Sequence, residues 1–187
     1  MINSFQQRKQ DVLFKIDKSS IGKWDEKIIS LCKKINSKEN YYTTSSCSGR
    51  IILMIDQEKK GENLFFFVFH DKINLRELRE QLNLALKKNK TIKFKLEPAI
   101  IHIACKTFKD AEKLFEIGKN AGWKRLGIIG TRNGFTFELN STEKLEFPII
   151  KNKKILVDDD FLKIIVDEAN GKMEIGWGKI RKLEGLM

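Results

Sequence analysis

The chain is poor in cysteine and histidine, and this limits the chemistry it can perform. It has two histidines and three cysteines, Cys32, Cys47 and Cys105, among its 187 residues. An odd number of cysteines without a CxxC pair argues against a disulfide framework and against a zinc knuckle. The acidic run Asp158-Asp159-Asp160 is typical of a helix start rather than of a metal site. We therefore expect a reducing compartment and no metal ion.

Long apolar runs and targeting segments are also missing. No run approaches the roughly 20 apolar residues that a membrane-spanning helix needs. The first residues, Met1-Ile2-Asn3-Ser4, lack the charged and apolar regions of a signal peptide. The sequence therefore predicts a soluble, cytoplasmic protein without a membrane partner.

The glycines form no nucleotide-binding motif. Neither GxGxxG nor a phosphate loop ending in GK[ST] occurs in the chain. A standard Rossmann cofactor site is therefore not supported. The glycines from the predicted helix 107–118 to the predicted strand 135–139 match neither motif, and they are Gly118, Gly122, Gly127, Gly130 and Gly134.

Basic residues, in contrast, are abundant. Lysine and arginine number 36 against 25 acidic residues, which gives a formal charge of +11 and a sequence pI near 9.5. This excess favours a polyanionic partner, and nucleic acid is the leading candidate. Lysine-rich faces also simply keep proteins soluble, so both interpretations stay open. The lysines concentrate in two clusters, Lys87, Lys88, Lys90, Lys93 and Lys95, and Lys151, Lys153 and Lys154.

Apolar periodicity predicts a mixture of helices and strands. Helical stripes occur within 5–16, 24–37, 75–86, 107–118 and 158–169, and strand patterns within 51–55, 64–69, 92–96, 99–105, 126–131 and 135–139. The runs 51–55 and 64–69 are continuously apolar, as in central strands covered on both faces. Because the order shows no strict βαβ alternation, we predict an α+β fold. It would form a single compact domain over residues 1–187, with a mixed β-sheet flanked by helices and without a Rossmann fold.

Six consecutive residues, Ser45-Ser46-Cys47-Ser48-Gly49-Arg50, are the most distinctive part of the chain. Small polar side chains leave backbone N–H groups accessible, Gly49 permits close approach, and Arg50 can fork onto a carboxylate or phosphate. The pattern therefore predicts an anion-holding loop. A polar connector with local turns is an open alternative. Cys47 could also be the nucleophile of a cysteine hydrolase, which would need a histidine and a third orienting group.

Both histidines lie on predicted strands. By alternation, His102 shares a face with Ile100 and Ala104, which is typical of a core histidine bonded to a backbone carbonyl. His70 ends the run Phe65-Phe66-Phe67-Val68-Phe69, and ligand sites in sheets of α/β proteins gather where strands end. Both histidines remain candidates for a base or for a group that orients a substrate.

Two longer blocks of sequence carry a resemblance to a known family. The first runs from Tyr41 to Ile51, and the second from Phe94-Lys95-Leu96-Glu97-Pro98 into Ile101-His102-Ile103-Ala104-Cys105. Both blocks resemble the tRNA wybutosine-synthesizing protein 3 family. The chain departs from its relatives in having phenylalanines where many have Trp ahead of His70, and Leu126 where many have serine. Further matches extend the similarity over most of 17–182, at Asp17-Lys18-Ser19, Gly22, Asp25, His70, Ser141-Thr142-Glu143, Pro148 and Ala169-Asn170.

The resemblance implies a reaction, a cofactor and a partner. Members of this family use S-adenosylmethionine to methylate the N4 ring nitrogen of an aminocarboxypropyl-demethylwyosine guanosine derivative. This nucleoside lies next to the anticodon of phenylalanine tRNA, and the step belongs to wybutosine biosynthesis. We therefore expect an S-adenosylmethionine-dependent tRNA methyltransferase that lacks the Rossmann methyltransferase fold. A noncatalytic RNA-binding protein and, less favoured, a hydrolase dependent on Cys47 are the alternatives.

Roles for individual residues follow as hypotheses. His70 and His102 would be the catalytic base or would orient the acceptor. Tyr41 or Tyr42 would stack on the extruded base. The cofactor's amino-acid end, or the similar side chain of the substrate, would be held by Ser45, Ser46, Cys47, Ser48, Gly49 and Arg50. Secondary candidates are Asp17, Ser19 and Glu97, and the tRNA backbone would contact Lys87, Lys88, Lys90, Lys93 and Lys95.

Overall fold

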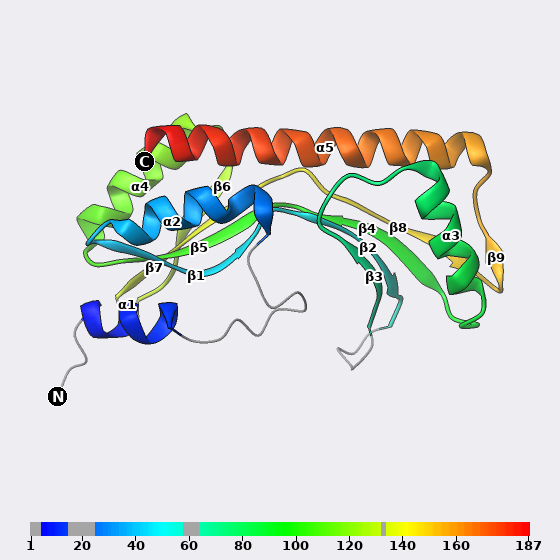
Figure 1. Ribbon diagram of the computed structural model, residues 1–187, viewed down its shortest axis with the longest axis horizontal. Helices are drawn as coiled ribbons and strands as arrows, with labels where there is room; N and C mark the ends of the chain where they lie inside the picture. The colour runs from blue at the N-terminus through cyan, green and yellow to red at the C-terminus, as the bar shows by residue number, and fades with distance from the viewer. Residues whose placement is uncertain (1–4, 15–24, 58–63, 132–133) are drawn as a thin grey trace. The chain divides into compact units, whose positions relative to one another are not determined.

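The computed structural model describes residues 5–14, 25–57, 64–131 and 134–187. The chain divides into two compact units, each assembled from separate stretches of sequence. Unit 1 draws on residues within 1–48, 99–142 and 176–187, and unit 2 on residues within 49–98 and 143–175. Each unit contains one β-sheet together with helical segments (Figure 1).

In the described part of unit 1, the sheet has four strands in the order β1-β5-β7-β6, and all of their pairs are antiparallel. The pairing of β6 with β7 confirms the hairpin that the Asn133-Gly134 pair indicates. Of these two residues the structure describes Gly134, whose φ of 103° favours glycine. The strands are β1 (Tyr41–Cys47), β5 (Ile100–Cys105), β6 (Arg125–Gly130) and β7 (Phe135–Asn140).

Within the described residues, three helices and the end of a fourth belong to unit 1. Helix α4 begins at the capping box that its sequence predicts, because Thr107 and Asp110 each accept a hydrogen bond from the other's backbone N–H. It ends just before Gly122, whose φ is 89°. The helical segments are α1 (Phe5–Leu13), a 3₁₀ turn (Glu26–Ile28), α2 (Ile29–Ser37), α4 (Phe108–Asn120) and the end of α5 (Asp159–Leu186).

Helices cover the two faces of the unit 1 sheet unequally. The Tyr41 hydroxyl donates to the backbone oxygen of Asp110 in α4, and the Thr43 N–H donates to the Asn36 side chain in α2. Tyr41 and Thr43 point the same way, so α2 and α4 share one face. Tyr42 points to the opposite face, where its ring packs against Phe5 of α1. Figure 1 shows α1 beside β1. We call this second face the α1 face.

Among the described residues of unit 2, the sheet has five strands in the order β3-β2-β4-β8-β9, again all antiparallel. Strand β4 confirms the alternation in its sequence, since Ile92, Phe94 and Leu96 are buried while Lys93 and Lys95 are half-buried on the other face. The strands are β2 (Arg50–Ile55), β3 (Phe65–Phe69), β4 (Ile92–Glu97), β8 (Leu145–Lys151) and β9 (Lys154–Ile155).

The apolar face of the unit 2 sheet is covered by α3 (Leu75–Leu86) and the first part of α5. The Phe147 ring of β8 stacks on Phe94 at 5.3 Å between centroids and also meets Phe161 of α5. The Asn170 side chain of α5 accepts from the N–H of Ile73 and donates to its carbonyl, which fixes the approach to α3. These contacts make a core from both helices and the sheet.

The predicted α+β class is confirmed, with some corrections. The described strand pairs are all antiparallel and form two sheets rather than one mixed sheet, because the chain changes sheet after β1, β4 and β7. The expectation of a single domain stays a prediction. Residues 45–47, expected in a loop, extend β1, and β3 lies at a sheet edge rather than at its centre. None of the described helices is both long and apolar enough to cross a bilayer.

Candidate functional site

A row of four residues crosses the α1 face of the unit 1 sheet. Ser45 of β1 lies opposite His102 of β5, and His102 lies opposite Glu138 of β7. Glu138 in turn lies opposite Gly127 of β6. Residues opposite each other in antiparallel strands project from the same face of the sheet. The fold therefore brings Ser45 and His102 together, as the sequence hypothesis requires, and adds Glu138 beside them.

His102 and Glu138 form a close polar pair. The Nε2 atom of His102 lies 2.8 Å from a carboxylate oxygen of Glu138, and the two side chains are 26% and 28% exposed. An ionised carboxylate accepts a hydrogen bond from Nε2–H and so leaves the Nδ1 lone pair available. His102 is therefore not a buried core residue bonded to a backbone carbonyl. It can accept a proton while Glu138 fixes its ring.

Glu138 was missed in the sequence because its partner is distant. The run Phe135-Thr136-Phe137-Glu138-Leu139 alternates, and Phe137 and Leu139 are buried, so Glu138 belongs to the polar side of a strand. This alternation can be seen in the sequence alone. Its significance depends on the pairing of β7 with β5, which joins residues 36 positions apart.

The three serines of the 45–48 segment point to different surroundings. Ser45 is exposed on the α1 face, whereas Ser46 accepts a hydrogen bond from the Cys32 thiol of α2. Ser48 is buried, and both its N–H and its hydroxyl donate to one carboxylate oxygen of Asp25, at 2.7 and 3.1 Å. The polar-connector alternative thus fits Ser46 and Ser48. Ser45 is the serine that faces the His102 row.

Gly49 and Arg50 continue the motif in unit 2, and Cys47 ends β1 in unit 1. Gly49 has a φ of 98°, a conformation in which a side chain is strained, so a glycine is needed at this position. Cys47 is half-buried and lies opposite Ile100. The sequence motif therefore divides between the two units.

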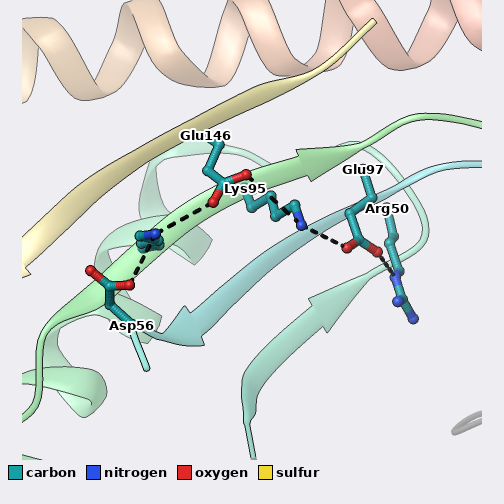
Figure 2. Close-up of polar contacts among 6 residues, drawn as sticks. Arg50, Asp56, Lys95, Glu97 and Glu146 are labelled. Atoms are coloured by element: carbon teal, nitrogen blue, oxygen red, sulfur yellow. Dashed lines mark hydrogen bonds and ion pairs between the residues drawn. The ribbon is translucent and has the colours of Figure 1, made fainter. Parts of the chain in front are cut away.

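Arg50 is held in a defined orientation. Its Nε donates to a carboxylate oxygen of Glu97 at 2.7 Å, and its guanidinium lies 5.0 Å from the centre of the Phe65 ring. Figure 2 shows the terminal nitrogens pointing away from Glu97. Burial alone would raise the pKa of Glu97, but hydrogen bonds and charge from Arg50 and Lys95 outweigh it and lower that pKa. A stably ionised Glu97 therefore presents the outer edge of the guanidinium to an anion.

Lys93 and Lys95 differ from the other predicted phosphate contacts because both already hold carboxylates. Lys93 lies 2.9 Å from Asp56 and 3.5 Å from Glu146. Lys95 lies 3.1 Å from Glu97 (Figure 2). The hydrogen bond with Asp56 is the largest cause of a raised Lys93 pKa. A tRNA phosphate would have to compete with these carboxylates. Of the five predicted phosphate contacts, Lys87, Lys88 and Lys90 are exposed and have no ion pair within the described residues.

His70 lies at the same end of the unit 2 sheet as Arg50. It directly follows Phe69, the last residue of β3, and Phe69 lies opposite Ile51, the residue after Arg50. Glu97 is opposite Arg50 at the end of β4. Unit 2 therefore places His70, Arg50 and Glu97 at the same end of its sheet, where their strands begin or terminate. The His70 side chain is half-buried.

The two predicted stacking tyrosines are not accessible to a ligand. Tyr41 is 8% exposed and its hydroxyl is bonded to Asp110, while Tyr42 is 5% exposed under α1. The prediction that either ring stacks on a base is therefore wrong, because adjacent helices cover both faces at this end of β1. The secondary candidates Asp17 and Ser19 lie outside the described residues.

Known proteins share long stretches of this sequence. The profile of the family described as "Methyltransferase TYW3" matches residues 7–187. A Pyrococcus horikoshii protein is 34% identical over 188 residues, covering 97% of this chain and 93% of its own. It is named tRNA(Phe) 7-((3-amino-3-carboxypropyl)-4-demethylwyosine(37)-N(4))-methyltransferase 1. The Danio rerio tRNA wybutosine-synthesizing protein 3 homolog is 35% identical over 186 residues, covering 96% of this chain and 73% of its own.

A solved structure shares the fold. The structure of PH1069 protein from Pyrococcus horikoshii superimposes with a TM-score of 0.86 at 33% sequence identity. The match covers 97% of this chain and 93% of that one. The α+β fold described above is therefore one that an existing structure of a related sequence also adopts.

Proposed function

The chain belongs to the methyltransferase TYW3 family, and we propose that it transfers a methyl group from S-adenosylmethionine to aminocarboxypropyl-demethylwyosine in tRNA(Phe). The acceptor atom would be the N4 ring nitrogen of this modified guanosine. The observation that carries the proposal is the family match over 7–187, together with archaeal relatives named for this reaction. A net charge of +11 suits a polyanionic tRNA.

The reaction needs positioning and a modest base. The ring nitrogen attacks the methyl carbon, the carbon–sulfur bond breaks, and the sulfur keeps the electron pair of that bond as a neutral thioether. The proton on the nitrogen must leave. Holding the two reactants in line supplies most of the acceleration, and a nearby base supplies the remainder. S-adenosylmethionine would provide the methyl group as a sulfonium, and the chain's residues would orient the acceptor and remove its proton.

The proposed base is His102. Its Nδ1 would accept the proton, because Nε2 is engaged by Glu138 at 2.8 Å. The carboxylate would stabilise the imidazolium that results. Ser45, opposite His102, would offer a hydroxyl on the same face. His70 stays a second candidate for the base, at the end of β3.

Arg50 is the proposed anchor for a carboxylate. Glu97 and Phe65 hold its guanidinium, and within the described residues Glu97 is the one acceptor that bonds it. Both the donor's amino-acid end and the acceptor's aminocarboxypropyl chain carry a carboxylate. The guanidinium fork could bind either carboxylate. Separate KM values for S-adenosylmethionine and for tRNA distinguish the two.

The test is a methyl-transfer assay with a defined acceptor. Purified protein is incubated with tRNA(Phe) carrying the aminocarboxypropyl-demethylwyosine precursor and with methyl-labelled S-adenosylmethionine, and the nucleosides are weighed by mass spectrometry. We expect a gain of one methyl group on the modified guanosine. His102→Gln should bind tRNA with wild-type affinity and transfer methyl about 100-fold more slowly or worse. Absence of methylation by the wild type would contradict the proposed function and favour a noncatalytic RNA-binding protein.

A further inference from the structure

Strand β3 forms an unusually aromatic edge of the unit 2 sheet. Its sequence is Phe65-Phe66-Phe67-Val68-Phe69, and among the described strands β2 alone pairs with it. Phe65 is 43% exposed, and the remaining side chains are half-buried. Apolar edge strands left bare tend to aggregate, and contiguous exposed aromatics commonly mark an interaction surface. The composition of β3 therefore indicates a partner.

Two cations lie over rings of this strand. The Arg50 guanidinium is 5.0 Å from the Phe65 centroid, and the Lys88 ammonium is 5.7 Å from the Phe66 centroid. Such contacts are favourable cation–π interactions. They also combine the two kinds of group that bind single-stranded nucleic acid, aromatic faces for bases and cations for phosphates.

The turn between α3 and β4 adds positive charge to the same surface. Asn89 at its centre has a φ of 50°, the left-handed conformation that reverses a chain in a tight turn. The flanking side chains Lys87, Lys88 and Lys90 are exposed, and none forms an ion pair within the described residues. Because Lys88 also lies over Phe66, the turn borders the strand at this ring.

We propose that Phe65, Phe66 and the lysines of this turn bind unpaired nucleotides of the RNA substrate. Bases would stack on the two rings, and Lys87, Lys88 and Lys90 would contact the phosphates. The proposal rests on the proposed function, because it assigns a surface to the tRNA of that reaction. We call Phe65, Phe66, Lys87, Lys88 and Lys90 the β3 surface.

The geometry of the edge favours RNA over an added protein strand. The register between β2 and β3 shifts between Leu53 and Met54, opposite the start of β3. Such an irregularity twists an edge and interrupts the regular row of backbone groups that another strand would need. Bases that stack on the strand need the faces of its aromatic rings and do not need a regular row of backbone groups. The positive turn also complements phosphates.

The experiment measures RNA affinity directly, without requiring catalysis. Binding of the full chain to fluorescent tRNA(Phe), and to a single-stranded heptanucleotide with the anticodon-loop sequence, is followed by anisotropy over a range of salt concentrations. Phe65→Ala should weaken both affinities about 10-fold, the typical size of one lost base–aromatic contact. Phe65→Trp should retain them. Lys88→Ala should weaken binding and lower the salt slope by about one.

Matched controls are available elsewhere in the chain. Phe108 is 53% exposed on α4, where it contacts the ring of Phe135, so Phe108→Ala tests removal of an exposed ring outside the surface. Lys163→Ala tests removal of an exposed lysine that already pairs with Asp160. Both should leave the affinity within about 2-fold of the wild type and the salt slope nearly unchanged. Circular dichroism verifies that each variant is folded.

Failure of this inference is distinguishable from failure of the proposed function. Wild-type methylation of tRNA(Phe), combined with unchanged affinity and salt slope in Phe65→Ala and Lys88→Ala, would overturn the β3 surface and leave the reaction intact. Loss of affinity in both variants, with no methylation by the wild type, would support the surface and overturn the reaction. A dimer in sedimentation that Phe65→Ala dissociates, with RNA affinity unchanged, would assign the surface to a second copy and overturn the inference.

Discussion

The carboxylate of Glu138 lies 2.8 Å from Nε2 of His102, across the adjacent strands β7 and β5. Each side chain is about one quarter exposed, so a ligand can reach the pair while the carboxylate still fixes the ring. Because Nε2 is engaged, Nδ1 is the atom through which His102 would take a proton. This relationship makes Glu138 a positioning residue for the proposed base and makes its contribution measurable.

Replacing Glu138 with Gln should lower kcat by about 10- to 100-fold, a size typical of losing the partner that orients a functional histidine. The amide can either donate or accept, so it no longer specifies the tautomer and no longer stabilises an imidazolium. The KM values for tRNA and S-adenosylmethionine should change little. Steady-state kinetics over about pH 6 to 9 should show an altered pH profile of kcat.

A control separates this role from a general loss of charge. Glu116 is exposed on α4, so Glu116→Gln removes a carboxylate without touching His102. It should leave kcat and its pH profile unchanged. An unchanged kcat and pH profile in Glu138→Gln would show that the pair does not take part in catalysis.

Local features of the fold could be predicted from sequence, because they depend on nearby residues. Asn74 and Thr107 cap α3 and α4 through residues three positions ahead, as their spacing indicates. The alternation of 92–96 correctly separates the buried apolar residues from the half-buried lysines. In each case the deciding contact lies within one turn of helix or along one strand.

Features that depend on distant partners could not be predicted. The polar segment Ser45–Cys47 has little apolar content, and it is a strand because Ile100, Ile101 and His102 pair with it. Likewise, the apolar run of β3 does not reveal that one of its edges has no described neighbour. The site was therefore predicted in part. His102 and Ser45 were named from sequence, whereas Glu138 could be identified only from the pairing of β7 with β5.

Arg50→Lys should raise one KM by about 10- to 100-fold, because a charge-assisted hydrogen bond to an ionised ligand contributes roughly 1.5–3 kcal/mol. Lysine keeps the charge but lacks the planar fork that binds a carboxylate through two nitrogens. A rise in the KM for S-adenosylmethionine would place the donor's carboxylate at Arg50. A rise in the KM for tRNA would instead place the acceptor's aminocarboxypropyl group there.

Glu97→Gln provides the companion measurement for Arg50. It removes the charge that orients the guanidinium, so it should raise the same KM as Arg50→Lys but by a smaller factor. Glu80 pairs with Arg76 on the exposed surface of α3, so Glu80→Gln breaks a matched ion pair elsewhere in unit 2. It should change neither KM. No rise in either KM for Arg50→Lys would rule out a carboxylate-binding role.

Alkylation of the folded protein at about pH 8 should be confined to Cys47. Burial raises the pKa of the Cys32 thiol to about 11 and that of the Cys105 thiol to about 12. Both thiols therefore stay protonated and covered, whereas Cys47 is half-buried. Mass spectrometry after iodoacetamide treatment should show one adduct on the native chain and three after denaturation in urea. Modification of Cys32 or Cys105 as fast as Cys47 would contradict this picture.

Cys47→Ser should keep most of the methyltransferase activity, with kcat within a few-fold of the wild type. The proposed reaction uses no thiol nucleophile, whereas a cysteine hydrolase would lose its activity outright. The same methyl-transfer assay measures the effect. A loss of methylation with tRNA binding intact would require a direct chemical role for this thiol.

The free energy of unfolding should fall as the pH rises above about 9. Burial, followed by the nearby charges of Asp110 and Cys105, raises the pKa of Tyr41 from 10.0 to about 12, and the thiols of Cys32 and Cys105 are raised from 9.0. Between about pH 9 and 12 the unfolded chain loses these protons while the native state retains them. The stabilisation is therefore fully present below about pH 9 and is lost as the pH rises through the folded-state pKa values.

Urea unfolding at about pH 8, 9, 10 and 10.5 measures this dependence. Cys105→Ala removes one of the three groups, so its stability should fall less steeply above about pH 9 than that of the wild type. It should also be less stable at about pH 8, because a buried side chain has been shortened. Cys47→Ser, which alters a half-buried thiol, controls for loss of a cysteine. Parallel pH profiles for Cys105→Ala and the wild type would contradict the assignment, because they would mean that Cys105 binds its proton no more tightly in the native state than in the unfolded chain.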